Sequence, residues 1–143
     1  MNTFSIGNVE IDIAGYLDTR IEDGTLVAFF PESDFANARF TVVTVMRDGG
    51  EVPRAAEKIM EDRAAKIGAK LHIEENFVWY YTVEIASEGT SGSKMHYWFV
   101  GMGGHAVVVS CFIDAAQSDS IDARRVLDSI LVSVKSIRRK SID

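Results

Sequence analysis

Two runs of apolar residues flank a glycine cluster between residues 93 and 113, and this is the clearest pattern in the chain. Met95–Val100 and Val107–Ile113 are rich in β-branched and aromatic residues, which favour strands. Gly101–Gly104 lies between the two runs, and its glycines tolerate positive φ. Because two strand-like runs joined by a short glycine-rich segment are typical of a hairpin, the pattern predicts one here.

The predicted hairpin has two faces, and both are mostly apolar. Side chains alternate along a strand, so an even-length connection groups even positions of the first strand with odd positions of the second. One face would carry His96, Trp98, Val100, Val107, Val109, Cys111 and Ile113, and the other Met95, Tyr97, Phe99, Ala106, Val108, Ser110 and Phe112. Apolar residues on both faces are typical of central strands covered on both sides, so we expect helices to cover this sheet.

Shorter alternating runs predict further strands. These are Val9–Ile13, with Phe4 and Ile6 pairing back onto it, then Leu26–Phe30, Phe40–Met46, Leu71–Ile73 and Phe77–Ile85. We expect Val9–Ile13 or Leu26–Phe30 to be an edge strand, and Glu10 and Asp12 have the charges that discourage an edge from pairing with another chain. The chain is therefore expected to be a monomer or a weak homodimer.

Two amphipathic segments predict helices. The first runs from Pro53, which suits an opening turn, to Ile67, and Gly68 would end it. The second begins after Asp119 as its expected N-cap. Its apolar stripe consists of Ala123, Val126, Leu127, Ile130, Leu131, Val134 and Ile137. The cations at Arg138–Lys140 are explained by the helix dipole, and a basic address or a phosphate contact is the alternative.

These elements predict an α+β protein with a central antiparallel β-sheet and two main helices, in a single domain that spans residues 1–143. With 15 Lys and Arg against 21 Asp and Glu, the net charge is −6, which argues against a nucleic-acid partner. An acidic protein can bind a basic protein partner, or it can be acidic for solubility alone. No apolar run of about 18 residues and no leader pattern is visible, so we expect a cytoplasmic protein that does not bind a membrane.

No motif for catalysis, metal binding or cofactor binding stands out. The chain has three histidines, His72, His96 and His105, and the two on the predicted hairpin, His96 and His105, are separated along it and would not share a metal. Cys111 and His96 could face each other as a nucleophilic dyad, but a buried thiol is inert. Gly101–Gly104 lacks the lysine and the following helix of a phosphate loop. We therefore expect no enzyme and no cofactor, and a small enzyme that uses Cys111 or His96 remains the alternative.

The order of elements and three local patterns resemble the PsbP-like superfamily, whose members are α/β/α sandwiches around an antiparallel sheet. Val9–Asp18 looks like the family's opening strand followed by a glycine, an aromatic residue and an acid, with Ala14 where a proline is common. The passage from Val42–Asp48 to the helix at 53–67 looks like that of bacterial type VI secretion effector chaperones. The last part of the chain resembles the closing strand and helix of the family, at Val107–Phe112, Asp114–Gln117 and Val126–Ile130.

The resemblance implies a binding module. Members of the superfamily include photosystem accessory subunits, a nuclear transport factor, periplasmic lipoproteins and secretion chaperones. For this chain it implies a bacterial secretion-associated protein, either an immunity protein or an effector chaperone, that binds a cognate effector. The alternative from another class is a small-ligand sensor with an apolar pocket under the aromatic sheet face.

The expected partner-binding residues share one face of the predicted sheet. Pairing parity places Tyr80 and Glu84 on the same side as Tyr97 and Phe99. Aromatic anchors with a nearby charge are typical of interface cores. The alternative is that the first helix covers this face and makes it core. The C-terminal helix is expected on the opposite face, over Trp79 and Trp98.

Overall fold

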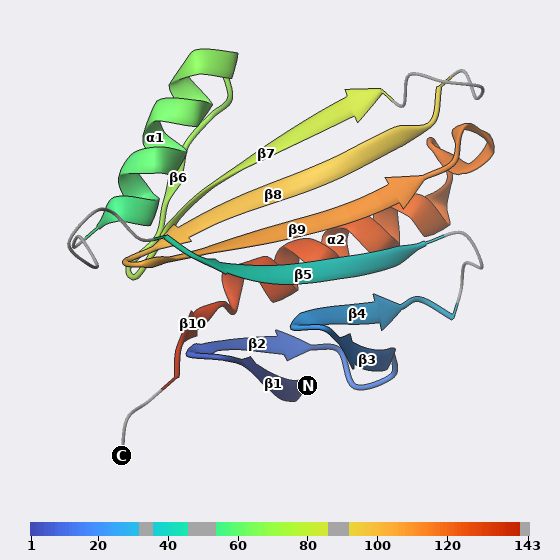
Figure 1. Cartoon of the computed structure of the whole chain (residues 1–143). Coiled ribbons are helices and arrows are strands. Elements are labelled where there is room, and N and C mark those ends of the chain that lie inside the picture. Colours follow the sequence, from blue (N-terminus) through green and yellow to red (C-terminus); the bar gives the residue numbers. More distant parts are fainter. Residues whose placement is uncertain (32–35, 46–53, 86–91, 141–143) are drawn as a thin grey trace.

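The computed structural model describes residues 1–31, 36–45, 54–85 and 92–140. Its helices are α1 (Ala55–Ile67), α2 (Ile121–Lys135) and a short 3-10 helix, η1 (Ala115–Gln117). Its strands are β1 (Asn2–Ile6), β2 (Val9–Ile13), β3 (Asp18–Glu22), β4 (Thr25–Phe29), β5 (Asn37–Thr44), β6 (His72–Ile73), β7 (Val78–Ile85), β8 (Lys94–Met102), β9 (His105–Ile113) and β10 (Arg138–Arg139). The α+β class with antiparallel strands and two main helices is confirmed (Figure 1).

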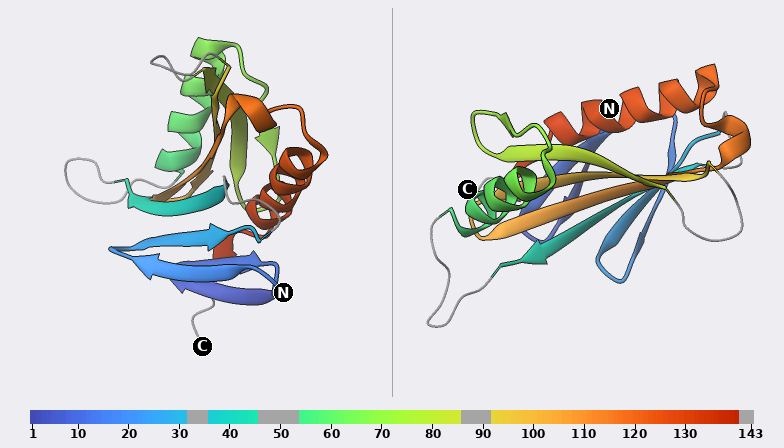
Figure 2. Two further views of the ribbon diagram at one scale, coloured as in Figure 1. Left: turned by 90° about the vertical axis from the view of Figure 1, so that its right-hand side faces the viewer. Right: turned by 90° about the horizontal axis from the view of Figure 1, so that it is seen from above.

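The strands form two antiparallel sheets. The large sheet has the order β3-β4-β5-β9-β8-β7-β6, and the small sheet has the order β1-β2-β10. The two helices lie on opposite faces of the large sheet, as the view from above shows (Figure 2). The small sheet packs with α2 on the same side, so one layer of the molecule combines a helix with three short strands.

The central hairpin has the predicted register. His96 lies opposite Cys111 and Trp98 opposite Val109, so the two faces are composed as expected. The turn is shorter than the glycine cluster, because β8 extends to Met102 and only Gly103 and Gly104 connect the strands. Gly101 therefore lies within β8.

The glycine at position 101 has a packing role instead of a turn role. An added Cβ there would lie 2.5 Å from the carbonyl oxygen of Ala56, in the first turn of α1. Only a residue without a side chain allows the backbone of α1 to approach β8 this closely. Gly103 supplies the turn itself, with φ of +60°.

The main core lies between the large sheet and α2. The buried side chains of α2 include Val126, Ile130 and Val134, which pack with Trp98 and Val109 of the central hairpin. Val9, Ile11 and Ile13 of β2 complete this core from the small sheet. Burial of each aliphatic side chain contributes about 1.5–3 kcal/mol. The apolar stripe of the C-terminal helix therefore faces the Trp98 side of the sheet, as predicted.

The helix ends differ in part from expectation. The N-cap of α2 is Ser120, whose Oγ accepts a hydrogen bond from the Ala123 N–H at 3.0 Å, so the expectation of Asp119 was wrong by one residue. Gly68 ends α1 in the left-handed conformation as predicted, with φ of +72°. Pro53 and Met46 lie outside the described residues.

The expected edge strands are both interior. β2 lies between β1 and β10, and β4 lies between β3 and β5, so the prediction that one of them is an edge was wrong. The reason for β2 is that Arg138–Arg139 continues as strand β10 and pairs with it, so the helix dipole alone does not explain these cations. Glu10 and Asp12 thus form ion pairs with Arg138, and they do not protect an unpaired strand edge.

Candidate functional site

Tyr80 does not lie on an accessible surface. Only 1% of the residue is exposed, because Met60 and Ala64 of α1 pack over it. Its ring stacks on that of Phe99, with centroids 5.0 Å apart. Burial raises the pKa of the Tyr80 phenol. The interpretation of Tyr80 as a partner-binding residue is therefore corrected: at this position α1 covers the sheet, and Tyr80 belongs to the core.

The helix α1 covers only one end of this face. In Figure 1, α1 lies beside the first residues of β7, and the far ends of β7, β8 and β9 extend well beyond it. Phe99 marks the boundary, since it is half-buried and the Arg63 guanidinium lies 4.8 Å from its ring centroid. Beyond it, Tyr97 is half-buried and Glu84 is exposed. Three of the four predicted residues thus lie at the margin of α1 or outside it.

The uncovered surface, called here the open face, lies next to these residues on the neighbouring strands. Tyr97 pairs with Ser110, which pairs with Arg39, and Met95 pairs with Phe112 and Glu84. We define the open face as Arg39, Glu84, Met95, Tyr97, Ser110 and Phe112. Phe112 has 39% of its surface exposed, which is unusual for an aromatic residue in a central strand. The alternation of side chains in the hairpin is enough to place Phe112 on this face. The sequence pattern does not predict that α1 leaves Phe112 uncovered.

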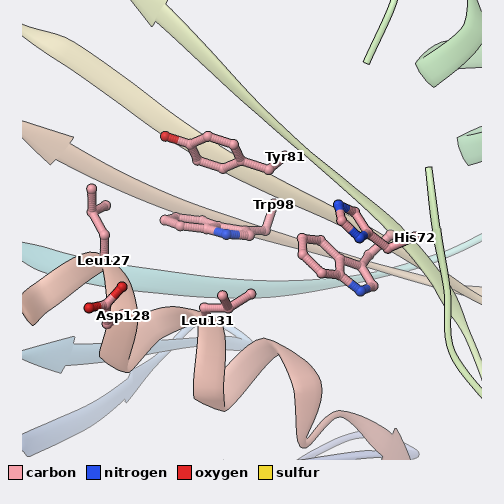
Figure 3. Close-up of a pocket in the computed structure, with 7 residues that line it drawn as sticks. His72, Tyr81, Trp98, Leu127, Asp128 and Leu131 are labelled. Atoms are coloured by element: carbon pink, nitrogen blue, oxygen red, sulfur yellow. The ribbon is translucent and has the colours of Figure 1, made fainter. Parts of the chain in front are cut away.

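A pocket lies on the opposite side of the sheet, between the strands and α2 (Figure 3). Its volume is about 230 Å³. The sheet wall consists of His72, Trp79, Tyr81 and Trp98, and the helix wall of Leu127, Asp128 and Leu131. The wall is ordered by aromatic contacts, since His72 stacks on Trp79 with centroids 4.0 Å apart. The Trp79 indole N–H donates a hydrogen bond to Glu74 at 3.1 Å, which fixes the orientation of the ring.

Burial disfavours the reactive form of the thiol in the hypothetical Cys111 and His96 dyad. The two residues face each other in register, as the sequence predicted. Burial raises the pKa of the Cys111 thiol to about 12, so the thiolate needed for nucleophilic attack is scarce near neutral pH. Nδ1 of His96 forms a hydrogen bond of 2.6 Å with the Tyr81 hydroxyl group. The arrangement fits a buried cysteine beside a hydrogen-bonded histidine.

The three histidines are not gathered around a common point. They lie on β6, β8 and β9, and the described residues contain no group of three His, Cys, Asp or Glu side chains that could hold a metal ion. Gly103 and Gly104 form a hairpin turn that is followed by β9, whereas a phosphate loop would be followed by a helix. Among the described helices, none has both the length and the apolar composition needed to cross a bilayer.

Comparisons with known proteins identify the fold. No family model matches the sequence, and no curated protein matches it. A crystal structure from Bacteroides thetaiotaomicron is similar, with a TM-score of 0.64 and 14% sequence identity over 94% of this chain. The chain spans only 46% of that protein. The solution structure of a cyanobacterial PsbP, CyanoP from Synechocystis, is similar with a TM-score of 0.59 and 11% identity, over 96% of this chain and 91% of that one. The chain therefore has a PsbP-like fold, and at these identities the likeness concerns the fold alone.

Proposed function

We propose that this chain is a non-enzymatic domain that binds another protein through the open face. The observation that carries the proposal is the partial cover by α1, which buries Tyr80 and leaves Tyr97 and Phe112 accessible beyond it. Aromatic side chains provide large contact area at low entropic cost, and they dominate many interfaces. Glu84 and Arg39 lie on either side of the aromatic pair and supply the charged rim that fixes orientation.

The partner class that we propose is a bacterial secretion effector, which the chain neutralises or escorts in the cytoplasm. The choice of this partner class is supported by the sequence patterns at Val9–Asp18 and Val42–Asp48. It is also supported by the net charge of −6, which suits a basic partner. The partner would be sought among the products of neighbouring genes. A neighbour with the features of a secreted toxin is the first protein to test.

The test is a calorimetric titration that measures the affinity of such a partner protein for the unmodified chain and for two variants of the chain. Tyr97→Ala should weaken binding by about 1–3 kcal/mol and leave thermal stability nearly unchanged. Val132→Ala removes an apolar side chain that is more exposed than Tyr97 from α2, on the other side of the sheet, and should bind like the unmodified chain. Equal affinity of all three proteins would overturn the assignment of the open face.

A second candidate function is the binding of a small ligand in the pocket under α2. The aromatic wall of Trp79, Tyr81 and Trp98 is the observation that favours it. Native mass spectrometry of freshly purified protein would detect a retained ligand as an increment in mass. This function uses the opposite side of the sheet, so both functions can belong to one chain.

A further inference from the structure

We infer that the pocket between the sheet and α2 binds an organic cation with a quaternary ammonium group. Three aromatic rings form one wall: Trp79, Tyr81 and Trp98. The ring centroids of Tyr81 and Trp98 are 5.2 Å apart, with the ring planes at 44°, and Tyr81 is the most exposed of the three rings, at 37%. Aromatic faces carry partial negative charge and attract cations that lie over them.

A carboxylate completes the site from the helix side. Asp128 of α2 lines the pocket opposite the aromatic wall (Figure 3). It forms no ion pair with any other residue in the part of the chain that the structure describes. Asp128 is exposed, so it lies at the solvent side of the pocket, and its unpaired carboxylate attracts a cation by its charge.

The surrounding charges place the cation at one end of the pocket. Burial, together with the charges of Lys70 and Lys135, lowers the pKa of the His72 imidazole, and Glu74 opposes this effect only in part. Burial and the two lysines therefore disfavour a cation at the His72 end. Asp128 supplies negative charge on the side of the pocket where Tyr81 and Trp98 lie, so this side is the favoured position (Figure 3).

The chemistry of the lining selects among cations. A primary ammonium group has three N–H donors, and the lining offers Asp128 as the only charged acceptor. Two leucines and three aromatic rings supply most of the remaining surface. A quaternary ammonium group has no N–H donors and a surface of methyl groups, so it loses less hydration free energy on leaving water than a primary ammonium group does. The volume of about 230 Å³ suits a small molecule such as choline or the end of a trimethylated lysine side chain.

The chain offers a direct reporter for this site. It contains two tryptophans, and both line the pocket. Intrinsic tryptophan fluorescence of the full chain therefore reports on this region alone. Choline should change the emission saturably. Its neutral isostere, 3,3-dimethyl-1-butanol, has the same shape without the charge and should bind at least about tenfold more weakly.

Two variants separate the charge from the aromatic wall. Asp128→Asn should weaken choline binding about five- to tenfold, and Tyr81→Leu by a similar factor, whereas Tyr81→Phe keeps the ring and should bind nearly as well. Asp62→Asn removes an exposed carboxylate from α1, far from the pocket, and serves as the matched control. Equal binding of choline and its neutral isostere, or an equal loss in Asp62→Asn and Asp128→Asn, would overturn the assignment.

The source of the ammonium group is resolved by a second pair of probes. A blocked peptide with trimethyllysine is compared with the same peptide carrying unmodified lysine. Preference for the methylated peptide over choline would indicate a protein ligand, and the reverse a free metabolite. Absence of a saturable change with choline and with the methylated peptide would refute the cation site. None of these outcomes bears on the open face, which lies on the other side of the sheet.

Discussion

The guanidinium group of Arg138 forms two hydrogen bonds with the carboxylate of Asp12, at 3.0 and 3.1 Å, although the two residues are 126 positions apart in the sequence. This bidentate pair ties β10 to β2 and closes the small sheet with the last described segment of the chain. Arg138 also lies 3.5 Å from Glu10. The interaction therefore joins an N-terminal strand to a C-terminal strand, in the layer that contains α2.

Arg138→Ala should destabilise the protein by about 0.5–1.5 kcal/mol, because it removes a bidentate pair that is only partly exposed to solvent. The measurement is the midpoint of urea unfolding. Arg20→Ala is the matched control, since its ion pair with Glu22 is more exposed and should contribute almost nothing. Equal midpoints for the two variants would show that the pair does not stabilise β10.

Stability should fall as the pH decreases below about 6.5, because burial lowers the pKa of His96 and of His72. The unfolded chain binds protons in this range and the folded chain does not, so acid favours unfolding. The measurement is the free energy of unfolding at pH 7.5 and at pH 5.0. His96→Gln should reduce the difference between the two values. An unchanged difference would indicate that His96 is protonated in the folded protein.

A second decrease in the free energy of unfolding should occur at lower pH. The hydrogen bond from Arg138 lowers the pKa of Asp12 below its ordinary value of 3.8. The stability that this pair contributes is present above that value and disappears as the pH falls through the pKa of the folded state. In Asp12→Asn this step of the unfolding profile should be missing, and its persistence would assign it to other carboxylates.

Gly101→Ala should destabilise the protein by about 1–3 kcal/mol, because the added Cβ would lie within 2.5 Å of the backbone of α1. Gly15→Ala is the control: the nearest atom to its Cβ is the Asn2 Nδ2, at 3.9 Å. Thermal unfolding of both variants measures the effect. A Gly101→Ala protein as stable as the control would mean that α1 can move away from β8 without loss.

The Cys111 thiol should react slowly with a thiol reagent in the native protein and rapidly in urea, because burial both shields it and raises its pKa. The time course of labelling at pH 7.5 is the measurement. Rapid labelling of the folded chain would favour the alternative that Cys111 is a reactive residue.

Several features of the fold follow from the sequence alone. Alternation of side chains is a local property, so the sequence suffices to assign the residues that share each face of the central hairpin. The apolar stripe of α2 likewise predicts the side that faces the core, because a helix has a fixed period. The local patterns also suffice for the α+β class.

The tertiary structure decided what covers each face and which strands are interior. Tyr80 and Tyr97 share a face by sequence, but the length and position of α1 bury the first and leave the second accessible. Whether β2 is an edge depends on Arg138, and the pocket depends on how α2 meets the aromatic wall of β7 and β8. These are contacts between distant parts of the chain, whose positions no local period determines.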